Sequence, residues 1–337
     1  MINRTHSIPI VLLTGFLGAG KTSVLNYLLK QNHGLKIGVI VNDFGDINID
    51  SLLVSAQTDT QLELTNGCIC CSVDDGELDD AISQLAYKGS TLDYIVIEAS
   101  GLAEPKDLAN MLRLMRNRYA HFDSVITVVD AANFAKNNKV HTSALANLNL
   151  ADIVIINKVD LVTQKALDEI ISTINFASPQ AKVVRAEQGQ VDPRLLLNSD
   201  LPLNNTRQLK LTNGSNDHDH EHLHESFSSV SFTTVKPLNP DKFEAWAGKL
   251  GDDIFRAKGI CYFGMKGVGQ KYIFQAVGTR YELKLDEWAG HETPLTQLVV
   301  IGKNLSQSAI KKELDELIDS EPDNISADTL MDIFKYK

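Results

Sequence analysis

Three cysteines lie close together in the segment NGCICCS at positions 66–72. In an extended loop, residues two positions apart face the same side, so Cys68 and Cys70 can converge and Cys71 can add a third thiolate. Zinc and similar ions bind thiolates in tetrahedral sets, and three thiolates leave one position of such a set open. No second pair of cysteines or histidines follows at the spacing of a structural zinc site. We therefore expect an exchangeable metal site, with redox sensing and structural packing as alternatives.

A glycine-rich segment, GFLGAGKT at 15–22, has the pattern G-x-x-x-x-G-K-T between an expected strand and an expected helix. Glycines let successive N–H groups point at phosphate oxygens, and the helix N-terminus adds positive potential. Lys21 is expected to reach the β- and γ-phosphates, and Thr22 to coordinate Mg²⁺. The alternative is an ordinary glycine-rich turn. The nucleotide-binding residues expected here are Gly15, Gly18, Ala19, Gly20, Lys21, Thr22 and Ser23.

The segment NKVD at 157–160 ends the apolar run IVIIN and indicates which base is bound. A carboxylate at Asp160 can accept hydrogen bonds from the ring N–H and the exocyclic amine of guanine. Adenine offers no donors at those positions and would leave the carboxylate unpaired, which is costly in a buried site. Asn157, Lys158 and Asp160 are therefore expected to bind guanine; the alternative is an exposed turn with incidental charges.

A buried strand ends in IVIEASG at 95–101. Glu98 can hold the Mg²⁺ shell or orient a water molecule, and the N–H of Gly101 can sense a γ-phosphate. The alternative is a solvated acid at a strand end.

Alternating histidines occupy the polar segment DHDHEHLHE at 217–225. Such a segment can bind several divalent ions weakly, whereas the alternative is a solvated acidic loop. The expected weak ligands are His218, His220, His222 and His224. The remaining cysteine, Cys261, lies in the apolar segment GICYF and is expected to be a buried thiol.

The composition limits the class of protein. The net charge of −11 argues against a nucleic-acid binder or an anionic-membrane binder, since either needs a basic face. Clustered cysteines fit a reducing compartment rather than a secreted disulfide framework. The apolar run at 8–13 is too short to span a bilayer, so we expect a cytoplasmic protein without a membrane partner.

Short runs rich in Val and Ile alternate with amphipathic segments through the first two hundred residues. Strands are predicted at 8–14, 36–42, 92–99, 124–130, 151–157 and 181–186. Continuous apolar content is typical of strands covered on both faces, so the sequence predicts a doubly wound, mainly parallel α/β sheet. We divide the chain into a nucleotide-binding domain at 1–200, a His-rich linker at 201–226 and a smaller α+β domain at 227–337.

Taken together, these motifs resemble those of the CobW family of P-loop GTPases, whose members act as metallochaperones or metal-insertion factors. The resemblance rests on TGFLGAGKT (14–22), NDFG (42–45), GCICC (67–71), IEASGLAEP (97–105), NKVD (157–160) and TQLVVIGKNL (296–305). It implies a P-loop GTPase fold, with Glu98 as the Walker B glutamate and the three clustered cysteines as the family's metal motif. Where the family usually has N-E-F-G, this chain has Asp43, whose carboxylate keeps the charge but has a shorter reach. The expected catalytic residues are Lys21, Glu98 and Asp43.

The expected function couples GTP to metal affinity. GTP and Mg²⁺ would order the segments around Asp43, Cys70 and Gly101, and hydrolysis would release the metal to a client protein. Zinc is the expected metal, and Co²⁺ and Ni²⁺ suit similar sites. One alternative is a GTP-dependent regulator or scaffold with a structural zinc; another is a P-loop kinase for a small molecule. Assembly as a homodimer is left open.

Overall fold

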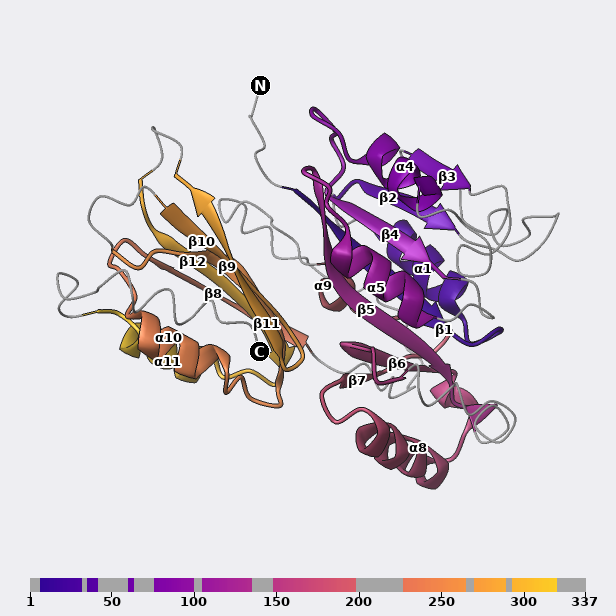
Figure 1. The fold of residues 1–337 in the computed structure, drawn as a ribbon. Coiled ribbons are helices and arrows are strands. Elements are labelled where there is room, and N and C mark those ends of the chain that lie inside the picture. Colours follow the sequence, from indigo (N-terminus) through magenta and orange to yellow (C-terminus); the bar gives the residue numbers. More distant parts are fainter. Residues whose placement is uncertain are drawn as a thin grey trace, which may run out of the picture.

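Two β-sheets, each with its own helices, make up the part of the chain that the structure describes (Figure 1). The computed structural model describes residues 7–31, 35–41, 60–63, 76–99, 105–134, 148–197, 227–264, 270–288 and 293–319. Residues 198–226 lie outside this part, so the predicted linker and the domain boundaries placed around it stay predictions.

The first sheet has seven strands in the order β3-β2-β4-β1-β5-β6-β7, and all of its pairings are parallel. Its strands are β1 (Ile8–Gly15), β2 (Ile37–Val41), β3 (Thr60–Glu63), β4 (Tyr94–Glu98), β5 (Ala120–Asp130), β6 (Ile153–Asn157) and β7 (Lys182–Arg185). Six of these match the predicted strands. The predicted doubly wound α/β fold is confirmed.

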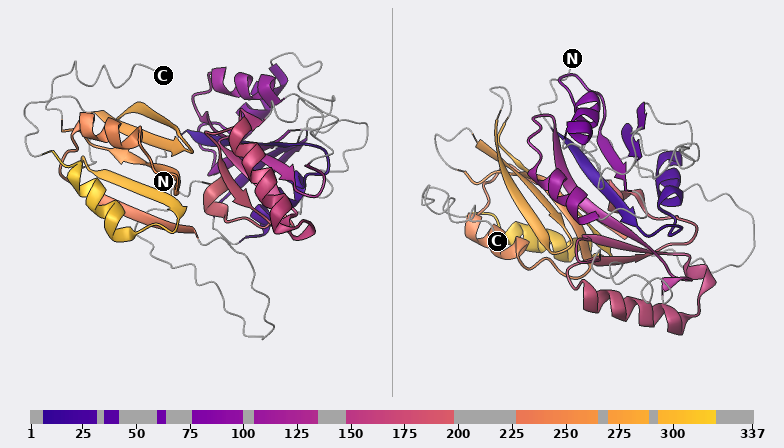
Figure 2. Two further views of the ribbon diagram at one scale, coloured as in Figure 1. Left: turned by 90° about the horizontal axis from the view of Figure 1, so that it is seen from below. Right: turned by 45° about the vertical axis from the view of Figure 1, so that its right-hand side comes forward.

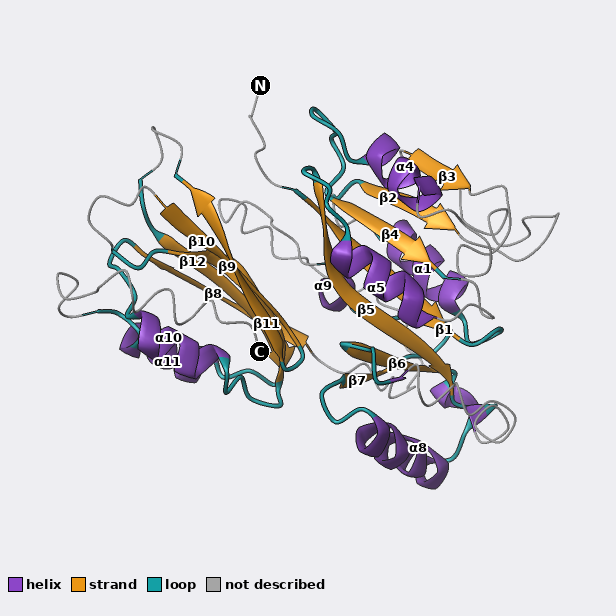
Figure 3. Cartoon of the chain, viewed as in Figure 1, coloured by secondary structure: helices purple, strands orange, loops and turns teal. Residues whose placement is uncertain are grey.

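Helices cover both faces of this sheet (Figure 3). The helices are α1 (Lys21–Lys30), α4 (Gly76–Leu85), α5 (Pro105–Leu114), α8 (Gln164–Ala177) and α9 (Pro193–Leu196). Along β1, Val11 and Leu13 pack with α1, whereas Ile10 and Leu12 pack with α4 and α5. Because side chains alternate along a strand, apolar residues at successive positions bury both faces. This explains the continuous Val and Ile runs.

The second sheet has five strands in the order β11-β10-β9-β12-β8 and is antiparallel. Its elements are β8 (Phe227–Thr234), α10 (Pro240–Ala247), β9 (Ile254–Cys261), β10 (Gln270–Val277), β11 (Arg280–Glu287), β12 (Thr296–Lys303) and α11 (Gln307–Glu316). Helices α10 and α11 pack on the outer face, away from the first sheet, in both Figure 1 and Figure 2. The predicted small α+β unit is confirmed.

The inner face of the second sheet joins the core of the first unit. Phe255, Val277 and Ile301 share a buried apolar cluster with α1 and α9. Arg256, which is fully buried, donates hydrogen bonds to the carbonyls of Leu195 and Leu196 at 2.9 Å and forms an ion pair with Asp123 of β5. Burial opposes ionisation of Asp123, but the neighbouring Arg256 guanidinium outweighs it and lowers the pKa of that carboxyl. The charged pair therefore fastens the two units together.

A second arginine follows the turn between β10 and β11. Arg280 donates to both carboxylate oxygens of Asp152 at 3.0 Å and to the carbonyl of Asp123 at 2.6 Å. Burial raises the pKa of Asp152, although the Arg280 guanidinium opposes that rise. Asp123 and Asp152, near the amino ends of β5 and β6, thus each form an ion pair with an arginine of the second sheet.

His121 lies at the same joint and contacts Ser7 and Gln275. Its Nδ1 is 2.6 Å from the Ser7 hydroxyl, and its Nε2 is 3.0 Å from the amide of Gln275. Burial, and then the charges of Lys284 and Lys258, lower its pKa to about 3. The imidazole is therefore neutral when the protein is folded near neutral pH.

Among the described residues, no helix is both long enough and apolar enough to cross a bilayer.

Replacing Arg256 by Met should strongly destabilise the protein, because Asp123 would remain buried without its cation. We expect the free energy of unfolding to fall by about 3–5 kcal/mol, measured by urea denaturation. The double variant Arg256→Met/Asp123→Val removes both charges and should recover most of that loss. A single variant within about 1 kcal/mol of the parent would show that the pair is not buried in solution.

Acid should destabilise the folded state through His121. Between pH 6.5 and about 3, the unfolded chain binds a proton at this imidazole and the folded chain does not. Stability therefore falls as pH decreases, by about 1.4 kcal/mol per pH unit from this group. His121→Gln keeps an amide near Ser7 and Gln275 and should flatten the profile between pH 6.5 and 5. An unchanged slope in denaturation series across that range would contradict the assignment.

Candidate nucleotide site

The glycine-rich loop lies between β1 and α1, as the sequence predicts. Gly18 and Gly20 have φ angles of 76° and 100°, a backbone region that favours glycine. A Cβ on Gly20 would lie 2.2 Å from the Asn157 Nδ2, so the loop approaches β6 more closely than any side chain would allow. Helix α1 then begins at Lys21, with its amino end at the loop.

Lys21, Thr22 and Glu98 meet at the carboxyl ends of β1 and β4. The Lys21 Nζ donates to the carbonyl of Gly15 at 3.0 Å, and the Thr22 hydroxyl donates to the Glu98 Oε1 at 2.9 Å. Glu98 is paired in register with Leu13 and is only 2% exposed. A hydroxyl beside a carboxylate is a set of hard oxygen donors, which fits Mg²⁺.

The NKVD segment closes the site from the carboxyl end of β6. The Asn157 Nδ2 donates to the carbonyl of Ala19 at 3.0 Å, and its Oδ1 accepts from the N–H of Gly189 at 2.9 Å. The Lys158 Nζ donates to the carbonyl of Gly18 at 2.8 Å and to the Asp130 Oδ2 at 2.7 Å. Two motifs far apart in the sequence are therefore joined directly.

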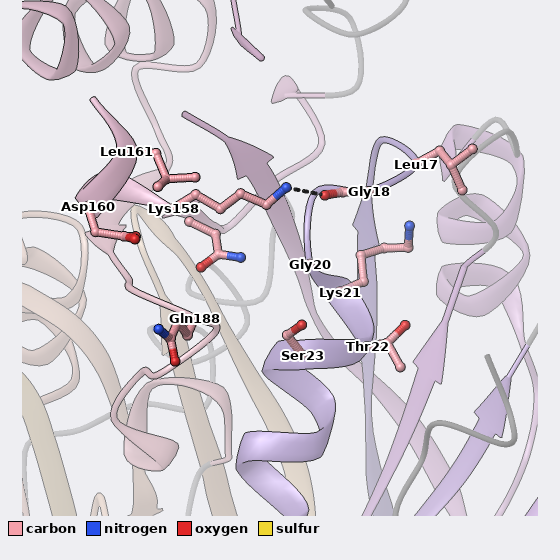
Figure 4. A pocket seen from close by; sticks show the side chains of 11 residues that line it. Leu17, Gly18, Gly20, Lys21, Thr22, Ser23, Lys158, Asp160, Leu161 and Gln188 are labelled. Atoms are coloured by element: carbon pink, nitrogen blue, oxygen red, sulfur yellow. Dashed lines mark hydrogen bonds between the residues drawn. The ribbon is translucent and has the colours of Figure 1, made fainter. Parts of the chain in front are cut away.

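A cavity of about 630 Å³ lies between these loops, within the usual size range of small-molecule pockets. Figure 4 shows Asp160 and Gln188 on one side of it and Lys21 and Thr22 on the other. Because these two pairs of residues lie on opposite sides, a base and a phosphate chain could bind at opposite sides of the cavity. The residues that line the cavity are Leu17, Gly18, Gly20, Lys21, Thr22, Ser23, Asn157, Lys158, Asp160, Leu161 and Gln188.

Several predicted site residues lie outside the described part of the chain. These are Asp43, Cys68, Cys70, Cys71, Gly101, His218, His220, His222 and His224. In the part that is described, no three His, Cys, Asp or Glu side chains are grouped to hold a metal. Cys261 is buried and its pKa is raised by that burial, so the predicted apolar thiol is confirmed.

Asp130 and Gln188 were not among the predicted site residues. Asp130 ends β5 in register with Asn157, and Gln188 follows β7 in a turn with φ of 51°. The run SVITVVD did show an acid at the end of a buried strand, which is the signal that could have identified Asp130. No pattern in the sequence singles out Gln188.

The chain matches known sequence families over both units. Residues 9–185 match the family described as CobW/HypB/UreG, nucleotide-binding domain. The chain belongs to the CobW family. Residues 227–318 match the family described as the cobalamin synthesis protein cobW C-terminal domain, so the CobW resemblance extends over the second sheet.

Two zinc chaperones are similar to this CobW-family chain over most of their length. A zinc chaperone CobW from Pseudomonas aeruginosa is 34% identical, with 91% of this chain and 90% of the relative covered. The zinc chaperone YjiA from Escherichia coli is 31% identical, with 91% and 97% covered. A crystal structure of Zn(II)-bound YjiA GTPase from Escherichia coli covers 93% of this chain and 100% of that chain, with 23% identity and a TM-score of 0.44.

Gly20→Ala should weaken nucleotide binding, because the added Cβ would collide with Asn157 and strain the backbone. We expect affinity for guanine nucleotides to fall at least about tenfold, measured by fluorescence titration. Gly89→Ala is the matched control: its φ is 103°, but nothing lies within 4 Å of the added Cβ. That control should retain full affinity. Equal affinities for the parent and Gly20→Ala would contradict the loop's close approach to β6.

Proposed function

We propose that the chain is a GTP-hydrolysing metallochaperone that binds a divalent metal and delivers it to a client protein in a nucleotide-dependent way. The observation that best supports GTP binding is the cavity in which the phosphate loop and the NKVD segment meet. The relatives described as zinc chaperones support zinc as the cargo.

Guanine selection is assigned to Asp160. Its carboxylate lies on the wall of the cavity opposite Lys21 and Thr22 (Figure 4). Guanine presents two N–H donors to a carboxylate in that position, whereas adenine presents none and would leave it unpaired. A site built to accept hydrogen bonds rejects a ligand that cannot donate them.

Phosphate binding is assigned to the loop and to Lys21. Lys21 is buried and is the first residue of α1, where the helix adds positive potential. Thr22 and Glu98 would hold Mg²⁺, which neutralises charge on the phosphate oxygens when bound. Asp43 and Gly101 are proposed to contact the metal or water and the γ-phosphate, respectively.

The cysteine segment follows β3, and the register of the sheet relates that strand to the nucleotide site. Glu63 at the end of β3 pairs with Val41, which pairs with Glu98. Neighbouring strands are about 4.8 Å apart, so the backbone of Glu63 lies roughly 10 Å from that of Glu98. Cys68, Cys70 and Cys71 thus follow a strand that ends at the nucleotide edge. This supports a metal site that responds to the nucleotide.

The histidines at 218–224 are proposed to capture divalent ions weakly and to supply the tighter cysteine site. Zinc is the proposed cargo, and Co²⁺ or Ni²⁺ suit the same thiolates. A homodimer and a cytoplasmic location are likewise proposals.

Zinc affinity should depend on which nucleotide is bound. We expect zinc to bind roughly five- to 150-fold more tightly with a non-hydrolysable GTP analogue than with GDP, measured by competition with a zinc-chelating dye. By linkage, zinc should raise the preference for that analogue over GDP by the same factor. Cys70→Ser should abolish the coupling in both directions and leave GTP affinity near that of the parent.

Deletion of 216–225, which removes the four alternating histidines, is the control for Cys70→Ser. It should reduce the number of loosely bound ions and retain one tight, nucleotide-sensitive site. Identical zinc affinities with the two nucleotides would rule out the metallochaperone and leave a GTPase with a structural zinc. Equal binding of GTP and ATP by the parent would rule out the GTPase assignment itself.

A further inference from the structure

We propose that Asp130 is a positioning residue of the nucleotide site: it holds Lys158 against the phosphate loop although it does not line the cavity. The inference rests on the proposed function in one respect, namely that the cavity takes GTP and GDP. It adds a residue outside the phosphate-loop and NKVD motifs to the groups that determine nucleotide affinity.

The geometry joins three parts of the chain through one ammonium group. The Lys158 Nζ lies 2.7 Å from the Asp130 Oδ2 and 2.8 Å from the carbonyl oxygen of Gly18. The Lys158 side chain is 31% exposed, whereas that of Asp130 is 4% exposed. The buried carboxylate is therefore the fixed end of this contact, and the lysine is the end that can move.

Asp130 is itself held by a short turn. The backbone N–H of Asn133 donates to its Oδ1 at 3.1 Å, and the Asn133 side-chain amide donates to its Oδ2 at 2.9 Å. Burial opposes ionisation, but the hydrogen bonds from Lys158 and Asn133 outweigh it and lower the pKa of this carboxyl. Asp130 also ends β5 directly opposite Asn157 of β6. Its oxygens are thus fixed and charged beside the NKVD segment.

Lys158 needs such an anchor for two reasons. Its φ of 62° is in the left-handed region, which is unfavourable for a residue with a side chain. A lysine ammonium group is also strongly hydrated and sits on a flexible stem, so a partly exposed one readily exchanges a protein partner for water. A buried carboxylate makes the inward position preferable, because charge-assisted hydrogen bonds are the stronger kind.

Loss of the contact between Asp130 and Lys158 should weaken nucleotide binding without slowing hydrolysis of bound GTP. Lys158 reaches the loop at Gly18 and lines the cavity, so losing its position would loosen both the phosphate loop and the wall of the base site. Asp130 does not line the cavity, and Thr22 and Glu98 keep their own hydrogen bond without it. The Michaelis constant should therefore rise while the turnover number stays nearly unchanged.

The test is a double-mutant cycle with Asp130→Asn and Lys158→Met. Asn keeps the shape but loses the charge, and its amide must direct N–H groups at either Lys158 or Asn133, which are donors too. We expect Asp130→Asn to weaken both GDP and GTP at least about fivefold, with turnover at saturating GTP within about twofold of the parent. In the Lys158→Met background, Asp130→Asn should cause no further loss.

Two controls separate this role from a merely structural one. Asp107→Asn removes the same charge from an exposed position on α5 and should leave affinity unchanged. Thermal denaturation of every variant reports folding separately from affinity. Parent-like GDP affinity of Asp130→Asn would overturn the proposal, and so would losses that multiply fully in the double variant. Failure of the parent protein to bind GTP would instead contradict the proposed function.

Discussion

The carboxamide of Asn157 joins the loops on which the nucleotide site depends. It donates to Ala19 in the phosphate loop and accepts from Gly189 in the turn after β7. Asn157 is nearly fully buried, so both ends of its amide must be paired, and each partner is a backbone group rather than a side chain. Gly189 also lies close to the start of α1, because a Cβ on Gly189 would lie 2.7 Å from the backbone of Ser23. The glycines here are therefore required by packing as well as by phosphate chemistry.

Most of the first sheet could be predicted, because buried parallel strands require apolar residues on both faces. The strand that sequence patterns missed, β3, reads TQLE and carries no apolar run. The predicted strand at 124–130 also misses the start of β5, since its first residues include His121 and Asp123, each of which has a partner in the second sheet. The apolar segment KYIFQAVGTRYEL at 271–283 is not one strand but a hairpin, and Gly278 at its turn has a φ of 60°. A strand such as β5 is hard to predict from sequence where its polar residues are paired with residues far away in the chain.

The same reasoning explains what could be predicted of the site. Lys21, Thr22 and Asn157 belong to compact motifs whose spacing carries their chemistry, and the structure brings those motifs to one cavity. Asp130 acts through a lysine 28 positions away, and Arg256 pairs with an acid 133 positions away. The first pairing depends on the order of strands within the first sheet and the second on how the two sheets pack, so neither can be read from local spacing.

The order of strands divides the sheet into two halves with different constraints. On one side of β1, β5 and β6 carry Asp130 and Asn157 at their carboxyl ends, while Asp123 and Asp152 at their amino ends are paired with arginines of the second sheet. The proposed base site therefore rests on strands that are held at both ends. On the other side, β4, β2 and β3 end at Glu98, Val41 and Glu63, and the segments with Gly101, Asp43 and the three cysteines follow them in turn. Coupling between sites requires an element with two arrangements. Under the proposed function, the base lies on the half of the sheet that the arginines hold, and the segments proposed to contact the γ-phosphate, water and metal follow the strands of the other half.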